Sequence, residues 1–325
     1  MLKALPQRVL FLSDLDGTWL SKNPENRRAL DEGVQKLKDT YQKRGLELEF
    51  GYVTARPPVR VEQENLPRQD WTITFNGGFI HEGRPGQVGL DGDYHRNNQN
   101  STWEDLNAQS GFRSDKVAAE CRQLLTLPRF ANLKFHTVGE VVHNSAADDC
   151  PFIASFCFDQ ASVKLTAAES RDDNHNGVAD IFDEETFGVP TQIKEFQEAL
   201  GERLRQDGIE FDLSSAYPFH GQPIVMFDAA SPVANKGTAV DFLRAARGVE
   251  RDHLIIAGDG GNDLAMMQAP DGSDDGRRAI VVGSNPQLHE AGSKLKNAIV
   301  RPAGEDSSLG VLRALEQHLE AIAGS

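Results

Sequence analysis

Short apolar runs, each ending at small or acidic residues, recur toward both ends of this 325-residue chain. The runs are continuous rather than alternating, which is typical of strands that are covered on both faces, as in a parallel sheet. They are Arg8–Ser13, Leu46–Val53, Trp71–Phe75, Ile224–Phe227, His253–Ala257 and Ala279–Val282. Helical patterns lie between several of these runs, so the sequence predicts an α/β fold built on a parallel sheet.

Two of the predicted helices have clear apolar faces. Thr238 is predicted to cap a helix that ends at Gly248. Its apolar positions are Ala239, Phe242, Leu243 and Ala246. A second helix at the C-terminal end should pack on the sheet through one stripe. This stripe consists of Leu309, Leu312, Leu315, Leu319 and Ile322.

The middle of the chain has a different composition, richer in Asn, Gln, Asp and Gly. Its predicted elements are strands at Val141–His143 and Phe152–Phe158 and a helix at Thr191–Gln206. Strands resembling those of the first part resume at Ile224. We therefore predict a core made of residues 1–84 and 222–325, with a smaller α+β domain, residues 85–221, inserted into it.

The charge balance restricts the partners. The chain has 34 basic and 49 acidic side chains, a net charge of −15, and such a field repels nucleic acid and anionic lipid surfaces. No apolar stretch approaches the roughly 18–20 residues that a membrane helix needs. Three cysteines are too few for a disulfide framework, which fits a reducing compartment. We expect a cytoplasmic protein that binds neither nucleic acid nor membranes.

The first apolar run ends in the segment Asp14-Leu15-Asp16-Gly17-Thr18. In a parallel α/β sheet, ligands bind beyond the carboxyl ends of the strands. Of two carboxylates separated by one residue, one can act as nucleophile and the other as acid and base, if a cation offsets their repulsion. The alternative for this segment is an acidic turn in contact with solvent.

Three other segments carry possible partners for these carboxylates. Thr54 and Arg56 follow the second run and offer a hydroxyl and a guanidinium to a phosphate, although a surface salt bridge is an equal alternative for Arg56. Lys236 lies just before a predicted helix, where an ammonium can meet an anion. Asp259 and Asp263, among glycines, complete an oxygen-rich set suited to Mg²⁺.

In this order, the motifs resemble those of the haloacid dehalogenase superfamily of phosphohydrolases. The matching residues are Asp14-x-Asp16-Gly17-Thr18, Thr54, Lys236 and Gly258-Asp259-x-x-Asn262-Asp263. The long segment between Thr54 and Lys236 resembles the cap of the Cof-type and sucrose-phosphatase-like subgroup. The resemblance implies a Rossmann-like core with an inserted cap of the C2 type, subclass IIB.

The resemblance also implies roles for single residues. Asp14 would attack the phosphorus and form an aspartyl-phosphate. Asp16 would protonate the leaving alcohol and later activate water. Thr54 and Lys236 would hold the phosphoryl oxygens.

The same resemblance implies a metal site and a substrate site. The implied Mg²⁺ residues are Asp14, Asp16 through its backbone carbonyl, Asp259 and Asp263, the last together with Asn262 directly or in support. The predicted substrate-binding residues are Thr54, Arg56, Asn76, Gly77, Lys236 and Asn262; among these, Arg56 is predicted from its guanidinium and not from the resemblance. For Asn76 and Gly77, which follow the run Trp71–Phe75, a glycine-rich hairpin turn is an equal alternative.

A second metal site is predicted inside the insert, over residues 172–183. The spacing of its oxygen side chains and of one glycine matches a calcium loop of the EF-hand type. The predicted Ca²⁺ residues are Asp172, Asn174, Asn176, Val178, Asp180 and Asp183. The loop departs from the pattern in ending with an aspartate and in lacking an entering helix, so an acidic, solvated loop is the alternative.

Taken together, the sequence predicts a Mg²⁺-dependent phosphatase. Its substrate would be a small phosphorylated metabolite, and the subgroup resemblance favours a sugar phosphate. Two alternatives stay open: a phosphomutase or phosphotransferase of the same fold, and a non-catalytic calcium-binding regulatory protein. We expect a monomer or a homodimer.

Overall fold

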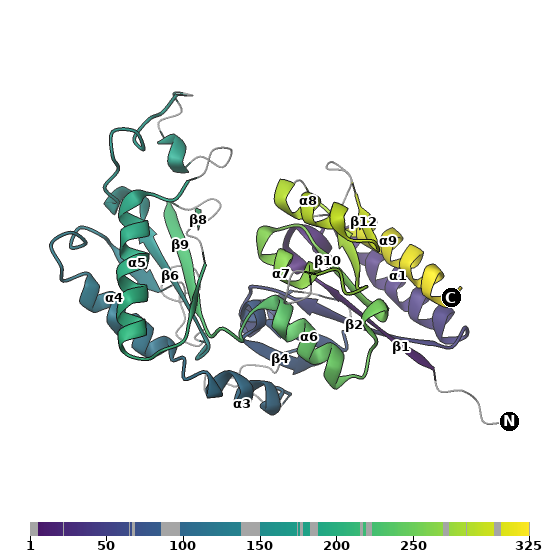
Figure 1. Ribbon diagram of the computed structural model, residues 1–325. Coiled ribbons are helices and arrows are strands. Elements are labelled where there is room, and N and C mark those ends of the chain that lie inside the picture. Colours follow the sequence, from purple (N-terminus) through teal and green to yellow (C-terminus); the bar gives the residue numbers. More distant parts are fainter. Residues whose placement is uncertain are drawn as a thin grey trace. The chain divides into compact units, whose positions relative to one another are not determined.

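The chain divides into two units (Figure 1). Unit 1 comprises Met1–Glu104 and Asn235–Ser325, and unit 2 comprises Asp105–Ala234. The computed structural model describes residues 6–21, 23–64, 66, 69–85, 98–137, 150–173, 175, 178–182, 188–214, 217–218, 223–268, 273–283, 285–301 and 307–324. Unit 1 is thus interrupted in sequence by unit 2.

Within the described residues, unit 1 contains a seven-stranded sheet in the order β12-β11-β10-β1-β2-β3-β4. All neighbours are parallel except β3 and β4, which form a hairpin. The strands are β1 (Gln7–Ser13), β2 (Leu46–Val53), β3 (Trp71–Thr74), β4 (Phe79–Glu82), β10 (Leu254–Gly258), β11 (Arg278–Val281) and β12 (Ala298–Val300). The predicted α/β fold with a parallel sheet is confirmed.

Helices cover both faces of this sheet. They are α1 (Pro24–Gln42), α2 (Pro58–Gln63), α6 (Lys236–Ala246), α7 (Leu264–Met267), α8 (Pro286–Lys294) and α9 (Ser307–Ala323). Ile280 of β11 packs in one core with α1 and α9, whereas its neighbours Ala279 and Val281 pack with residues of α7 and α8. Successive strand residues point to opposite faces, so the two helix groups lie on opposite sides. No helix among the described residues is long and apolar enough to cross a membrane.

Unit 2 is an α+β unit with an antiparallel sheet. Its strands are β5 (Phe135–Thr137), β6 (Ile153–Asp159), β7 (Asp212–Leu213), β8 (Tyr217–Pro218) and β9 (Ile224–Ala230). Helices α4 (Ser114–Leu124) and α5 (Thr191–Gln206) pack on one face of it. Helix α3 (Ser101–Gln109) crosses the division between the units. The helix predicted at Thr191–Gln206 is confirmed, while the strand predicted at Val141–His143 lies outside the described residues.

The strand that begins at Ile224 was wrongly predicted to belong to the core sheet. It forms β9, which pairs with β6, β7 and β8 in the antiparallel sheet of unit 2. Its first four residues are all buried, from Ile224 to Phe227. A continuous apolar run thus indicates that both faces are covered, but not in which sheet. The later unit boundary accordingly lies between Ala234 and Asn235 rather than at residue 222, and the earlier one after Glu104 rather than after residue 84.

The start of α6 also differs from the prediction. The helix begins at Lys236, and the side chain of Asn235 caps it by accepting the backbone N–H of Thr238 at 2.9 Å. The hydroxyl of Thr238 accepts the backbone N–H of Asn235 in return, at 3.4 Å. Thr238 therefore completes a capping box from inside the helix instead of starting it. This earlier start places Lys236 in the first turn of α6.

The aromatic core of unit 2 gives a stability prediction. Phe196 on α5 is fully buried against the rings of Phe130, Phe158 and Phe227. We expect Phe196→Ala to lower the free energy of unfolding by about 3–5 kcal/mol, because it removes apolar contacts and leaves a cavity. The control Leu106→Ala, at a position 38% exposed, should cost less than about 1 kcal/mol. Urea denaturation followed by circular dichroism measures both, and equal losses would contradict this packing.

Candidate active site

The site forms where the central strands of unit 1 end. Asp14 follows β1, and its backbone N–H donates to the carbonyl of Ala257 on the neighbouring strand β10 at 2.9 Å. Asp259 directly follows β10, and Thr54 directly follows β2. Because these strands are parallel, their carboxyl ends share one edge of the sheet. The predicted convergence of strand ends is thus present.

A buried lysine joins two of the carboxylates. The Nζ of Lys236 lies 2.6 Å from Asp14 Oδ1 and 2.7 Å from Asp263 Oδ1, and all three side chains are almost inaccessible to solvent. Burial acts to lower the pKa of Lys236, but the two carboxylates outweigh it and raise the pKa above its ordinary value. Burial raises the pKa of Asp14, against the opposing effect of Lys236. The ammonium therefore stays charged and holds both carboxylates in place.

Asp259 lies beside this pair. It accepts a hydrogen bond from the hydroxyl of Thr18 at 2.7 Å, and the same hydroxyl is 3.5 Å from Asp14 Oδ2. The second oxygen of Asp263 accepts the backbone N–H groups of Asp259 and Gly260, each at 3.0 Å. Burial also raises the pKa of Asp259, since removing a carboxylate from water disfavours its charge.

Three of these carboxylates fit a divalent cation. Asp14, Asp259 and Asp263 each offer an oxygen, and these oxygens lie within 4.8 Å of one another. Carboxylate oxygens are the ligands that Mg²⁺ prefers. One ammonium from Lys236 faces three carboxylates, so a bound cation would reduce the remaining repulsion. This is the one such group of acidic, His or Cys side chains in the part of the chain that the structure describes.

Two glycines allow the backbone to approach this closely. Gly17 has a φ of +75°, and a Cβ there would lie 2.2 Å from Oδ2 of Asp259. Gly237, next to Lys236, has no room for a Cβ either, because it would lie 2.2 Å from the carbonyl oxygen of Ala265. A side chain at position 17 would displace the carboxylate of Asp259, and one at position 237 would push α6 away from α7.

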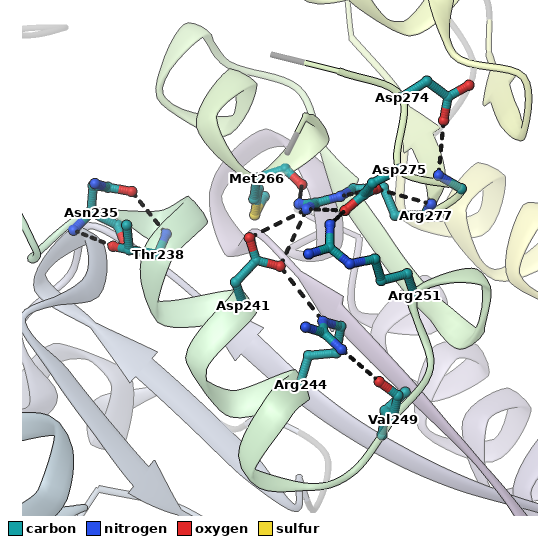
Figure 2. Close-up of polar contacts among 11 residues, drawn as sticks. Asn235, Thr238, Asp241, Arg244, Val249, Arg251, Met266, Asp274, Asp275 and Arg277 are labelled. Atoms are coloured by element: carbon teal, nitrogen blue, oxygen red, sulfur yellow. Dashed lines mark hydrogen bonds and ion pairs between the residues drawn. The ribbon is translucent and has the colours of Figure 1, made fainter. Parts of the chain in front are cut away.

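A buried arginine joins α6 to α7 (Figure 2). The guanidinium of Arg277, which is fully buried, donates to Asp275, to both oxygens of Asp241 at 3.2 and 3.3 Å, and to the carbonyl of Met266 at 3.0 Å. Asp241 lies on α6, the helix that begins with Lys236. Met266 lies on α7, the helix that begins directly after Asp263. The same guanidinium thus holds together the two segments that bring these charges into contact.

Asp16 lies apart from the buried carboxylates. Its side chain is 59% exposed and forms a two-pronged ion pair with Arg56, whose Nε and Nη2 lie 2.8 and 2.6 Å from its oxygens. The hydrogen bond to Asp16 and a second one to Glu64 raise the pKa of Arg56 above its ordinary value. Of the two alternatives for Arg56, the structure contains the salt bridge.

The other predicted site residues make structural contacts or lie on turns. Thr54 is fully buried; its hydroxyl accepts the backbone N–H of Arg56 at 3.1 Å, and its carbonyl accepts that of Asn76 at 2.9 Å. Asn76 and Gly77 form the turn of the β3–β4 hairpin, where the Gly77 carbonyl accepts the indole N–H of Trp103 at 2.9 Å. Asn262 is exposed on the turn before α7. A substrate contact at these residues stays a prediction.

The predicted calcium loop is described only in part, because Asn174, Asn176 and Asp183 lie outside the described residues. In the described part, both oxygens of Asp180 accept the backbone N–H of Asp173, at 3.2 and 3.3 Å. This contact is a turn within the loop and does not test the calcium prediction.

Two contacts of the site were missed by the sequence analysis. The hydroxyl of Thr18 was part of the quoted motif, and its place four residues after Asp14 was the signal that could have identified it as a partner of the carboxylates. Arg277 had no such signal, since its partner Asp241 is 36 residues away and an arginine before a strand is common.

Comparison with known proteins identifies a matching family. A family model described as "Sucrose-6F-phosphate phosphohydrolase" matches residues 7–124 and 189–319, which is more than half of the chain. The matched ranges include every residue of the carboxylate and lysine cluster. No curated protein matches the chain in a direct search.

Solved structures share the fold. A sucrose-phosphatase from Synechocystis sp. PCC6803, in complex with sucrose and phosphate, aligns with a TM-score of 0.57 at 17% identity, over 96% of this chain and 98% of that one. A haloacid dehalogenase-like hydrolase protein from Bacillus subtilis aligns with a TM-score of 0.52 at 14% identity, over 97% and 96% of the two chains. At identities of 14–17%, these two alignments show a shared fold and nothing about activity.

The buried Arg277 gives the next prediction. We expect Arg277→Met to lower the free energy of unfolding by about 1–3 kcal/mol, because the Met266 carbonyl would lose its buried donor, while Asp241 and Asp275 would keep Arg244 and Arg251 as partners. The control Arg28→Met removes an 83% exposed arginine from an ion pair on α1 and should cost less than about 0.5 kcal/mol. Urea denaturation at neutral pH measures both variants. If Arg277→Met cost no more than its control, the contacts of Arg277 with α6 and α7 would not contribute to stability.

Proposed function

The chain belongs to the sucrose-6F-phosphate phosphohydrolase family, and we propose that it hydrolyses a sugar phosphate through a covalent aspartyl-phosphate on Asp14, assisted by Mg²⁺. The protein is a phosphoric monoester hydrolase of the haloacid dehalogenase fold. The observation that carries the proposed chemistry is the ammonium of Lys236, which holds Asp14 at 2.6 Å and Asp263 at 2.7 Å at the end of the central strands.

Asp14 is proposed as the nucleophile because its two oxygens are held differently. Oδ1 is bound to Lys236 at 2.6 Å, whereas Oδ2 lies 3.5 Å from the Thr18 hydroxyl. Oδ2 would form the new bond to phosphorus while the bond from phosphorus to the sugar oxygen breaks and its electron pair leaves with that oxygen. Water would then attack the phosphorus, freeing inorganic phosphate and Asp14.

A bound phosphoryl group needs positive charge around its oxygens. Lys236 supplies an ammonium in the first turn of α6, where the helix dipole also favours an anion. We propose that Thr54, at the end of β2, contacts the same group through its hydroxyl. Since catalysis of phosphoryl transfer is mostly positioning and stabilisation of charge on the phosphoryl oxygens, holding these donors in place is the main task of the protein.

Asp14, Asp259 and Asp263 are the side chains that would hold Mg²⁺, as their oxygens lie within 4.8 Å of one another. When bound, the ion supplies charge neutralisation for the phosphoryl oxygens. The side chain of Asp16 is bonded to Arg56 on both oxygens, so only its backbone carbonyl is proposed for this role.

Asp16 is proposed as the acid and base. It would give a proton to the departing sugar oxygen and take one from the attacking water. Both of its oxygens already accept bonds from Arg56, but a carboxylate has about four lone-pair sites, so each oxygen retains capacity for a second partner. A side chain that is 59% exposed can also exchange protons with solvent.

The sugar phosphate is proposed from the family and not from a visible sugar site. The description of the matching family names a sucrose phosphate. The structure of similar fold from Synechocystis contains sucrose and phosphate. We propose that unit 2 selects the sugar, in the manner of a cap.

Substitution of the nucleophile tests this mechanism. We expect Asp14→Asn to lower phosphate release by about 10³-fold or more, because an amide oxygen is a poor nucleophile. The measurement is phosphate release from sucrose 6-phosphate and from para-nitrophenyl phosphate in the presence of Mg²⁺. Asp39→Asn, an exposed position on α1, is the matched control and should keep full activity. Equal activity of Asp14→Asn and wild type on either compound would contradict the mechanism.

Metal binding is tested without relying on activity. A ligand at 100 times its dissociation constant stabilises a folded protein by about 2.7 kcal/mol, so Mg²⁺ should raise the melting temperature after chelation. We expect Asp259→Asn to lose most of this rise, because one of three carboxylates becomes neutral. Without Mg²⁺ the variant should be at least as stable as wild type, since burial disfavours this charge. An unchanged Mg²⁺ effect in Asp259→Asn, with Asp39→Asn as control, would exclude Asp259 as a ligand.

A further inference from the structure

A chain of alternating charges runs outward from Asp16. The guanidinium of Arg56 uses its Nε and Nη2 edge for Asp16 and its Nη1 for Glu64, at 2.7 Å. Glu64 in turn lies 3.5 Å, through its second oxygen, from Nη1 of Arg27. The Nε of Arg27 donates to the backbone carbonyl of Ser21 at 2.7 Å.

This series of contacts begins at Asp16 and ends at Ser21, in the same turn. Asp16 and Ser21 are five residues apart in the segment that follows β1, and the same segment contains Asp14. Arg27 lies in the first turn of α1, while Glu64 directly follows the last residue of α2. Two helix ends outside the carboxylate cluster are thus linked to the two ends of one short turn.

Glu64 contributes more to the orientation of the Arg56 guanidinium than to stability. Exposed ion pairs contribute only about 0–1 kcal/mol each to stability. An arginine with a single partner, however, can rotate with it, whereas partners on two edges fix the plane of the guanidinium. Arg56 and Glu64 are 26% and 24% exposed, so neither is free to swing into solvent without losing contacts.

We propose that Glu64 is a positioning residue: by fixing the plane of Arg56, it aims the carboxylate of Asp16 at the leaving oxygen of the substrate. This inference rests on the proposed role of Asp16 as acid and base. It assigns to a residue outside the cluster, and to its partner Arg27, a part in protonating the leaving group. It assigns them no part in binding the phosphoryl group.

The dependence of the rate on the leaving group tests this role. Para-nitrophenolate leaves as a stable anion without a proton, whereas the oxygen of a sugar needs one. The ratio kcat/KM covers the steps through departure of the leaving group and excludes hydrolysis of the aspartyl-phosphate, which both substrates share. We expect Glu64→Gln to lower kcat/KM for sucrose 6-phosphate by about 10-fold, a fraction of the 10²–10⁴-fold that general acids contribute. With para-nitrophenyl phosphate, kcat/KM should change less than about 2-fold.

Matched variants separate positioning from a general loss of charge or structure. Glu32→Gln removes a glutamate from an exposed ion pair with Arg28 on α1 and should alter neither rate. Arg27→Gln should shift the two rates in the same direction as Glu64→Gln but by less. Glu64→Asp, which keeps the charge, should restore part of the rate with the sugar phosphate.

Failure of the role of Glu64 can be distinguished from failure of the mechanism proposed for Asp14. Equal loss on both substrates, or no loss on either, would overturn the role of Glu64 while the effect of Asp14→Asn still stands. If Asp14→Asn were fully active, the proposed chemistry itself would fail. A selective loss with the sugar phosphate supports the positioning role, because damage to the fold would affect both substrates alike.

Discussion

The contact on which the site depends is the buried ammonium of Lys236 between Asp14 and Asp263. A lone lysine at this depth would lose its charge, and two carboxylates without it would repel each other. Together they satisfy one another across β1, α6 and the turn after β10, three segments far apart in the chain. Removing one partner from such a buried group costs about 3–5 kcal/mol. The same charges that stabilise this junction are those proposed to carry out phosphoryl transfer.

Two networks of contacts adjoin this junction. Arg277 joins α6 to α7 through Asp241 and the carbonyl of Met266. Arg56 and Glu64 link the exposed Asp16 to the ends of α1 and α2. The first network is buried and contributes to stability, while the second is partly exposed and acts on the orientation of one side chain. A phosphatase of this kind needs both, because its chemistry depends on charges held at fixed positions.

The sequence predicted the parallel sheet and the residues at its edge because both follow from local patterns. Asp14 and Asp259 each end an apolar run, and parallel strands bring such ends together. The run at Ile224 was placed in the wrong sheet, since burial on both faces does not identify the neighbouring strands. The cap of α6 was assigned to Thr238 rather than Asn235 because both residue types can cap a helix. Contacts such as Arg277 with Asp241, or Glu64 with Arg27, depend on the folded arrangement and left no trace in the local pattern.

The central claim is that Asp14 becomes covalently phosphorylated, and one measurement addresses it directly. The protein is mixed with excess sucrose 6-phosphate and Mg²⁺, quenched in acid within one turnover, digested, and analysed by mass spectrometry. The account predicts a peptide that contains Asp14 and carries one additional phosphoryl group, with the group located on that side chain. A phosphoryl group on another residue, or phosphate release with no labelled peptide at any quench time, would contradict it.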